Sequence, residues 1–170
     1  IQADIKKAQT LPAQFYRSEA WFEKVTEKIF THTWLYLSDV NAVKQEQLLT
    51  PFNLLPGVLD EPIVVSCDKS GQLHCLSNVC THRGAIIVEE AKKSRLLSCR
   101  YHGRCFSMDG TFRSMPAFEA TENFPSEADH LPRIPFAERL KLLFVSLNPK
   151  VDFKEMFRPI QERVGWMPLD

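Results

Sequence analysis

The chain has 170 residues, and its 21 Lys and Arg residues balance 21 Asp and Glu residues, so the formal net charge is zero. This balance argues against binding of nucleic acid or of a membrane surface, because both attract basic proteins. The hydrophobic share of 44% predicts a real core, and no apolar run approaches the roughly 20 residues of a membrane span. We therefore expect one compact domain.

The N-terminal region is expected to be irregular up to about residue 17, and a helix follows. Ser18 is a suitable N-cap for this helix. Five apolar residues then fall on one face at helical spacing: Trp21, Phe22, Val25, Ile29 and Phe30. Such a stripe is typical of a helix that packs on a core.

From about Val40 the pattern changes to short β-type runs separated by turn residues. The runs cover residues 62–67, 73–79, 96–98, 105–108, 111–113 and 142–147. Asp109-Gly110 between two of these runs is a strong hairpin signal. Short strands at this spacing predict a mainly β fold, a small antiparallel barrel or sandwich. Residues 114–138, rich in Pro, Glu and Asp, indicate a long loop.

The C-terminal region returns to a helical pattern. Asp152 and Glu155 resemble a capping box. Four apolar residues keep the helical period: Phe153, Met156, Phe157 and Ile160. Pro159 is expected to break or restart this helix. We predict a main domain over residues 1–150 and a helical connection towards a further domain over residues 151–170.

Five cysteines occur in the chain: Cys67, Cys75, Cys80, Cys99 and Cys105. An odd number in a chain of this length argues against a complete disulfide framework. Metal ligation or free thiols in a reducing compartment fit better, so a cytoplasmic location is expected. The cysteines outside the motifs described next are expected to be buried free thiols.

Two short motifs combine cysteine with histidine. The first is Cys80-Thr-His82-Arg-Gly84, and the second is Cys99-Arg-Tyr-His102-Gly103, with sixteen residues between His82 and Cys99. Each motif offers one thiolate and one imidazole, and each ends in a glycine that lets the backbone approach a bulky centre. Two such loops, held side by side by strands, are suited to enclose one metal centre.

Two kinds of metal centre are compatible with these motifs. A mononuclear Cys2His2 zinc site is the simpler one, but zinc sites usually pair Cys with Cys and His with His. Here each motif mixes the two types. A two-iron cluster accounts for the mixture if both cysteines bind one iron and both histidines bind the other.

The pattern C-x-H-x16-C-x2-H resembles that of the Rieske [2Fe–2S] family. The wider context, from Asn78 to Gly84 and from Cys99 to the Asp109-Gly110 turn, resembles the N-terminal domain of Rieske-type non-haem iron oxygenase large subunits, the aromatic-ring-hydroxylating class. This resemblance implies a Rieske-type fold with two cluster-binding loops. It also implies the four ligands: Cys80 and Cys99 on one iron, His82 and His102 on the other.

The residues around the second motif indicate the class of cluster. High-potential respiratory Rieske proteins carry Ser and Tyr two and four residues after the second histidine, whose hydroxyls donate to sulfur. Arg104 and Phe106 stand there instead, and Ala85 and Tyr101 replace the cysteines of the respiratory loop disulfide. The resemblance therefore predicts a low-potential, oxygenase-type cluster. Many ring-hydroxylating members have Trp where this chain has Arg104.

Oxygenases of this family also carry a mononuclear Fe(II) held by two His and one carboxylate. The remaining histidines, His32, His74 and His130, are scattered and are expected to be structural or on the surface. By itself the chain is expected to pass single electrons and to hold no catalytic residue. Mononuclear iron is expected only in a full-length parent, a mono- or dioxygenase.

The resemblance implies partners as well. These are a reductase or ferredoxin as electron donor, the mononuclear iron domain of the parent or of a neighbouring subunit as acceptor, and a homotrimer in full-length relatives. Two alternatives stay open: a free-standing Rieske-type ferredoxin, and a zinc-stabilised binding module with no redox role.

Charge is uneven along the chain. Residues 83–104 hold six basic residues against two acidic ones: Arg83, Lys92, Lys93, Arg95, Arg100 and Arg104 against Glu89 and Glu90. Residues 109–130 hold five acidic residues against Arg113: Asp109, Glu119, Glu122, Glu127 and Asp129. These stretches are either a solvated surface or basic loops that steer an acidic electron donor.

Overall fold

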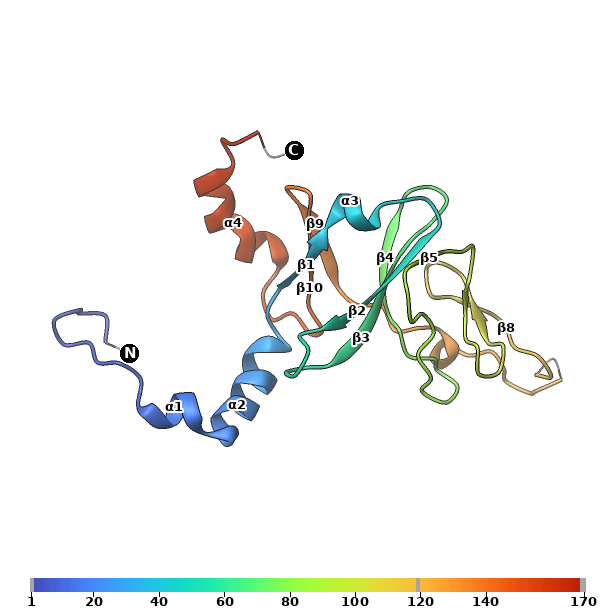
Figure 1. Cartoon of the computed structure of the whole chain (residues 1–170), viewed down its shortest axis with the longest axis horizontal. Helices are drawn as coiled ribbons and strands as arrows, with labels where there is room; N and C mark the ends of the chain where they lie inside the picture. The colour runs from blue at the N-terminus through green and yellow to red at the C-terminus, as the bar shows by residue number, and fades with distance from the viewer. Residues whose placement is uncertain (1, 119, 169–170) are drawn as a thin grey trace.

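The computed structural model describes residues 2–118 and 120–168 of the chain. Three antiparallel sheets make up the body of the molecule, and helices lie at its N-terminal and C-terminal ends (Figure 1). The prediction of a mainly β fold with a helix at each end is confirmed. Within the described residues the three sheets do not close into a barrel.

The central sheet has the strand order β4-β3-β2-β5. Its strands are β2 (Leu48–Leu54), β3 (Glu61–Cys67), β4 (Leu73–Ser77) and β5 (Lys92–Lys93). Residues 63–67 of β3 are buried without interruption. Because neighbouring side chains on a strand point to opposite faces, Ile63 and Val65 enter one core and Val64 enters another. The central sheet is therefore the middle layer of the fold.

The second sheet covers one face of the central sheet. It joins β1 (Leu35–Asp39), β10 (Leu142–Val145) and β9 (Phe136–Arg139), and Leu143 and Val145 of β10 enter the core between the sheets. The short helix α3 (Val40–Val43) adds two buried valines. Strands β1, β2, β5 and β9 were absent from the sequence prediction. β1 and β5 depend on pairing with partners that are distant in sequence, as Leu35 with Val145 shows. β2 and β9 each pair with the next strand along the chain.

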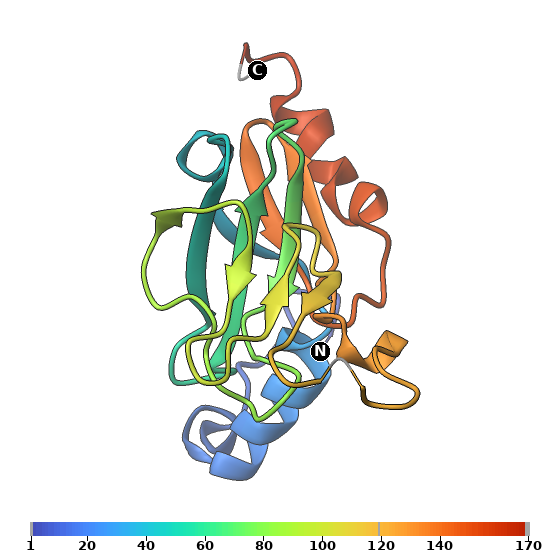
Figure 2. The same ribbon diagram turned by 90° about the vertical axis from the view of Figure 1, so that its right-hand side faces the viewer.

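The third sheet is small and covers the other face (Figure 2). It contains β6 (Leu97–Ser98), β7 (Cys105–Phe106) and β8 (Phe112–Ser114). The predicted hairpin through Asp109-Gly110 is confirmed, and Gly110 adopts a φ of 87° that favours glycine. The fully buried Phe106 anchors this sheet in the second core.

The N-terminal helix forms but does not pack as predicted. It consists of α2 (Glu19–Val25) and the π-helical turn η1 (Thr26–Phe30), after the unpredicted α1 (Ala13–Arg17). Trp21, Phe22 and Ile29 are 44–53% exposed. A π turn adds a residue to the helical repeat, so the apolar residues within and after it are rotated away from the helix face of those before it. The segment that contains α1 and α2 also extends away from the three sheets (Figure 1).

The C-terminal helix α4 (Phe153–Val164) begins where predicted, with Asp152 accepting the Lys154 N–H at 2.8 Å. The expected break at Pro159 is wrong, because the helix runs through it. Buried Phe157 packs on Phe144 of β10 at 5.6 Å between ring centroids. This packing stabilises the helix despite the hydrogen bond that proline removes.

The loop over residues 114–138 is largely confirmed. It contains one turn of 3₁₀-helix, η2 (Glu127–Asp129), and ends in β9. Glu119, counted above in the acidic stretch, lies outside the described residues. Among residues 2–118 and 120–168, no helix has the length and apolar character that a membrane span requires.

Candidate metal centre

The first loop, residues 80–85, begins shortly after β4 and is closed by its own backbone. The Cys80 N–H donates to the Ala85 carbonyl at 2.8 Å, and the Gly84 N–H donates to the Cys80 carbonyl at 3.0 Å. Gly84 has a φ of 71°, which glycine adopts without strain. Buried Asn78, just before the loop, bonds both the N–H and the carbonyl of Val88, just after it, through its side chain. These bonds hold the two ends of the loop together.

The second loop, residues 99–104, repeats this backbone frame. The Cys99 N–H donates to the Arg104 carbonyl at 2.9 Å, and the Gly103 N–H donates to the Cys99 carbonyl at 3.1 Å. Gly103 has a φ of 73°, and the ring of Pro116 lies close to its Cα. Two loops from different sheets therefore present Cys at the same position of the same frame.

The structure brings the four predicted ligands together as two pairs. Cys80 and Cys99 are both 3% exposed and belong to the same buried cluster, where Cys99 is close enough to raise the pKa of the Cys80 thiol. The rings of His82 and His102 lie 4.8 Å apart between centroids, at 74° to each other. The loops thus place sulfur beside sulfur and imidazole beside imidazole.

The protonation chemistry of these pairs suits metal binding. Burial raises the pKa of the Cys80 thiol, and the neighbouring Cys99 acts in the same direction. Partial burial lowers the pKa of His82, with the positive charge of His102 next in effect. Neutral imidazole is the form that ligates metal, and a cation beside the sulfurs would offset the cost of two buried thiolates.

One buried imidazole nitrogen lacks a hydrogen-bond partner among the described residues. This atom is Nδ1 of His102. Tyr101, which is exposed, stacks against the same ring at 3.9 Å. A buried, unpartnered imidazole nitrogen beside a buried thiol pair fits a group that binds through both elements.

The pairing does not suit a single ion. Over residues 2–118 and 120–168, no group of three or more His, Cys, Asp or Glu side chains is arranged to hold one metal ion. A mononuclear zinc site needs four ligands around one point. Two ligands on each of two irons, with sulfides completing each iron, match the observed pairs better.

Arg104 is not part of the exposed basic stretch to which the sequence assigned it. It is 3% exposed, and its Nη1 donates to Thr81 Oγ1 at 2.7 Å while its Nη2 donates to Asp129 Oδ1 at 2.9 Å. The guanidinium also lies over the rings of Phe112 and Phe124, at 5.3 and 5.5 Å. Arg104 was grouped with exposed basic residues on sequence grounds because its ion-pair partner, Asp129, is 25 residues away in sequence.

The other basic residues of this stretch lie at the surface. Arg83 and Arg100, one from each loop, are exposed, and Arg100 is 4.0 Å from Glu89. Asp109 of the acidic stretch pairs with Arg133 at 3.2 Å. The exposed residues are therefore available to a partner, whereas Arg104 and Asp129 satisfy each other.

The remaining histidines are held by hydrogen bonds, as expected of structural residues. Each remaining histidine has its own hydrogen-bond partner: His32 with the Asn148 carbonyl, His74 with Asp68, and His130 with the Phe112 N–H. Cys67 and Cys75 are buried free thiols, and burial raises the pKa of Cys75 to about 12. Cys105 is also free and half-buried.

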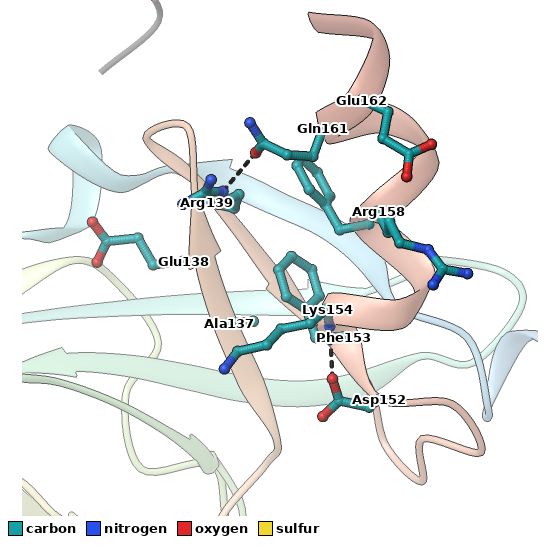
Figure 3. Close-up of a pocket in the computed structure, with 10 residues that line it drawn as sticks. Ala137, Glu138, Arg139, Asp152, Phe153, Lys154, Arg158, Gln161 and Glu162 are labelled. Atoms are coloured by element: carbon teal, nitrogen blue, oxygen red, sulfur yellow. Dashed lines mark hydrogen bonds between the residues drawn. The ribbon is translucent and has the colours of Figure 1, made fainter. Parts of the chain in front are cut away.

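A cavity of about 620 Å³ lies far from the loops, between β9 and α4 (Figure 3). Phe153 and Phe157 form its apolar floor, and Arg139 bonds Gln161 across its rim at 2.8 Å. Figure 1 shows α4 and the green-to-yellow loop region at opposite ends of the body. This cavity therefore does not contribute to the metal centre.

Comparison with known proteins places this geometry in context. The family model described as Rieske [2Fe-2S] domain matches residues 32–125, more than half of the chain. The carnitine monooxygenase oxygenase subunit of Escherichia coli (strain K12) is 27% identical over 148 residues, covering 86% of this chain and 38% of that protein. The chloroplastic choline monooxygenase of Beta vulgaris is 28% identical over 145 residues, covering 85% and 32%.

Solved structures agree on the fold. The crystal structure of the apo form of the quaternary ammonium Rieske monooxygenase CntA superposes with a TM-score of 0.83 at 24% identity, covering 93% of this chain and 46% of that one. The chain thus spans about a third to a half of the length of these relatives. The CntA structure shares the architecture of this chain. Both loops, residues 80–85 and 99–104, lie within the region that the family model matches.

Proposed function

Because the chain belongs to the Rieske [2Fe–2S] domain family and is homologous to Rieske oxygenase large subunits, we propose that its two loops hold a [2Fe–2S] cluster for one-electron transfer. Cys80 and Cys99 would bind one iron, and His82 and His102 the other. The cluster, when bound, accepts and releases single electrons. The observation that carries this proposal is the pairing of sulfur with sulfur and imidazole with imidazole.

The surrounding residues supply the conditions that such a centre needs. The buried thiols sit in a core that excludes water, and the loops' glycines allow the backbone to curve around the ligand atoms. His102 Nδ1, buried and without a partner in the described structure, is suited to bind iron. The histidine pair lies on the more exposed side, which suits it for electron exchange with a partner.

We assign the cluster to the low-potential class. Phe106 is fully buried and has no hydroxyl to donate to sulfur. Arg104, at the position of the serine in high-potential proteins, directs its guanidinium to Thr81 and Asp129. Fewer hydrogen bonds to sulfur stabilise the reduced state less.

The chain's role is that of the redox domain of a non-haem iron oxygenase, with residues 1–150 as the Rieske domain and α4 within a connection towards a catalytic domain. A reductase or ferredoxin would reduce it, and a mononuclear Fe(II) domain, in the same or a neighbouring subunit of a trimer, would accept the electron. The relatives are a monooxygenase oxygenase subunit and a monooxygenase, which favours this role over a free-standing ferredoxin. We place the protein in the cytoplasm, as its free thiols suggest.

The test is the content of iron, acid-labile sulfide and zinc in anaerobically purified protein, with EPR spectra before and after reduction. We expect two irons and two sulfides per chain, and a mixed-ligand Rieske signal that appears only on reduction. Cys99→Ser should abolish sulfide and signal. Cys105→Ser is the matched control, because Cys105 is a free, half-buried thiol next to the second loop, and it should keep both.

Two results would contradict the proposal. One zinc per chain without sulfide would indicate the structural zinc module instead. Equal loss of sulfide from both cysteine variants would show that the ligand assignment is wrong.

A further inference from the structure

Arg104 connects three parts of the chain that are distant in sequence. It belongs to the second loop, its Nη1 reaches Thr81 in the first loop, and its Nη2 reaches Asp129 in η2. Thr81 Oγ1 in turn donates to the Asp129 carbonyl at 2.9 Å. The two loops are therefore fixed to each other and to η2 through one side chain.

The two edges of the Arg104 guanidinium have different neighbours. Thr81 stands between the ligand candidates Cys80 and His82, so the guanidinium edge at Nη1 faces the first loop. The edge at Nη2 faces the carboxylate of Asp129. The cation thus contacts the first loop through one edge and its counter-ion through the other.

Solvent screens this charge only weakly. The Arg104 side chain is 4% exposed, and the rings of Phe112 and Phe124 cover its face. Charges in a region without water act more strongly on their neighbours than surface charges do. Asp129 offsets part of the effect, but its side chain is 18% exposed, so solvent screens its charge more than that of Arg104.

We propose that Arg104 is a positioning residue that fixes the second loop on the first and raises the reduction potential of the centre above the value that a neutral side chain would give. The inference rests on the proposed function, because it requires a redox centre between the loops. Reduction adds one negative charge, and a buried positive charge nearby stabilises the reduced form.

The experiment is an EPR-monitored redox titration of the holoprotein and of three variants. Arg104→Met removes the charge at similar length and should lower the potential. At the wild-type midpoint we expect about tenfold less reduced cluster relative to oxidised, which equals about 59 mV for a one-electron couple. Arg104→Lys keeps the charge and should restore most of this loss. Asp129→Asn removes the counter-ion and should raise the potential.

The opposite shifts of Arg104→Met and Asp129→Asn are the decisive result. General loosening of the loops would move both variants in the same direction, and that outcome, or no shift in either, would overturn the inference. Arg133→Met is the matched control, because Arg133 forms an exposed pair with Asp109 at 3.2 Å, and its potential should stay unchanged. If Arg104→Met loses its cluster, Asp129→Asn alone tests the inference: a higher potential supports it, and a lower or unchanged potential overturns it.

Failure of the inference can be told apart from failure of the proposed function. Wild-type protein without iron and sulfide would contradict both. Wild-type protein with the cluster, but with potentials that do not separate as stated, would contradict only the role of Arg104.

Discussion

The first and second loops share one backbone frame and differ in the residue that closes it. In both, the cysteine N–H bonds the carbonyl five residues later and a glycine with positive φ follows four residues after the cysteine. Ala85 closes the first loop and packs against the core, whereas Arg104 closes the second and bonds Thr81 and Asp129.

The two loops differ in the contacts that stabilise them. Asn78 supports the first loop from two residues before it and reaches only as far as Val88. The second loop depends on Arg104 and on a carboxylate from η2. A common frame can therefore be supported locally on one side and by a long-range ion pair on the other.

Alanine at each loop glycine should show the largest difference in stability. An L-residue at positive φ costs about 1 kcal/mol or more, so Gly84→Ala, whose added Cβ meets open space, should lower the free energy of unfolding by about 1 kcal/mol. Gly103→Ala should cost about 2 kcal/mol, because its Cβ would lie 3.2 Å from the ring of Pro116. Urea unfolding of both variants measures this.

Gly71→Ala is the control for backbone strain alone. Gly71 has a φ of 82° in the turn between β3 and β4, with open space around its Cα. It should lose as much stability as Gly84→Ala while keeping full sulfide content. Equal losses at Gly84 and Gly103 would show that Pro116 moves aside without cost.

The sequence predicted those features that local residues determine. The spacing of Cys80, His82, Cys99 and His102 named the ligand candidates, since the loops are short and their glycines fix the turn. The Asp109-Gly110 hairpin and the Asp152 cap are similarly local. In each case the deciding contacts lie within a few residues.

Features that depend on distant contacts were missed. β1 forms because β10, near the other end of the chain, pairs with it, Leu35 lying opposite Val145. Arg104 looked like a surface residue among other basic ones. Its burial follows from Asp129 and from the rings of Phe112 and Phe124, which only the folded loop 114–138 brings near.

Acid should affect the second loop through Asp129. The backbone N–H of Ser126 lowers the pKa of Asp129 most, and the Ser126 hydroxyl and Arg104 lower it further. A depressed pKa in the folded state means stability that is complete above the unfolded value of about 3.9 and is lost as the pH falls through the folded pKa. The urea midpoint should therefore drop more between pH 5 and pH 3 in wild type than in Asp129→Asn.

Arg104→Met separates the two sources of this effect. Because Ser126 is the larger cause, this variant should keep most of the pH dependence that Asp129→Asn loses. If both variants become equally flat between pH 5 and pH 3, Arg104 rather than Ser126 controls the Asp129 carboxyl.

The smallest effect should come from the exposed arginines, one in each loop. Reduction of the oxidised cluster by dithionite, which reacts as an anion, should slow about fourfold in Arg83→Glu at low salt, as expected for a two-unit charge change about 10 Å away in water. Arg100→Glu should slow it by a similar factor, because the change is again two charge units at an exposed position and Glu89, at 4.0 Å from Arg100, is present before and after the substitution. Stopped-flow absorbance measures both rates.

Salt and position distinguish steering from damage to the loops. At 1 M salt the Debye length falls to about 3 Å, so both variants should then react at nearly the wild-type rate. Arg158→Glu on α4, at the far end of the body, should not change the rate at any salt concentration. Rates that stay slow at 1 M salt would mean that the glutamates disturb the loops, and unchanged rates at low salt would leave the exposed basic residues as a solvated surface.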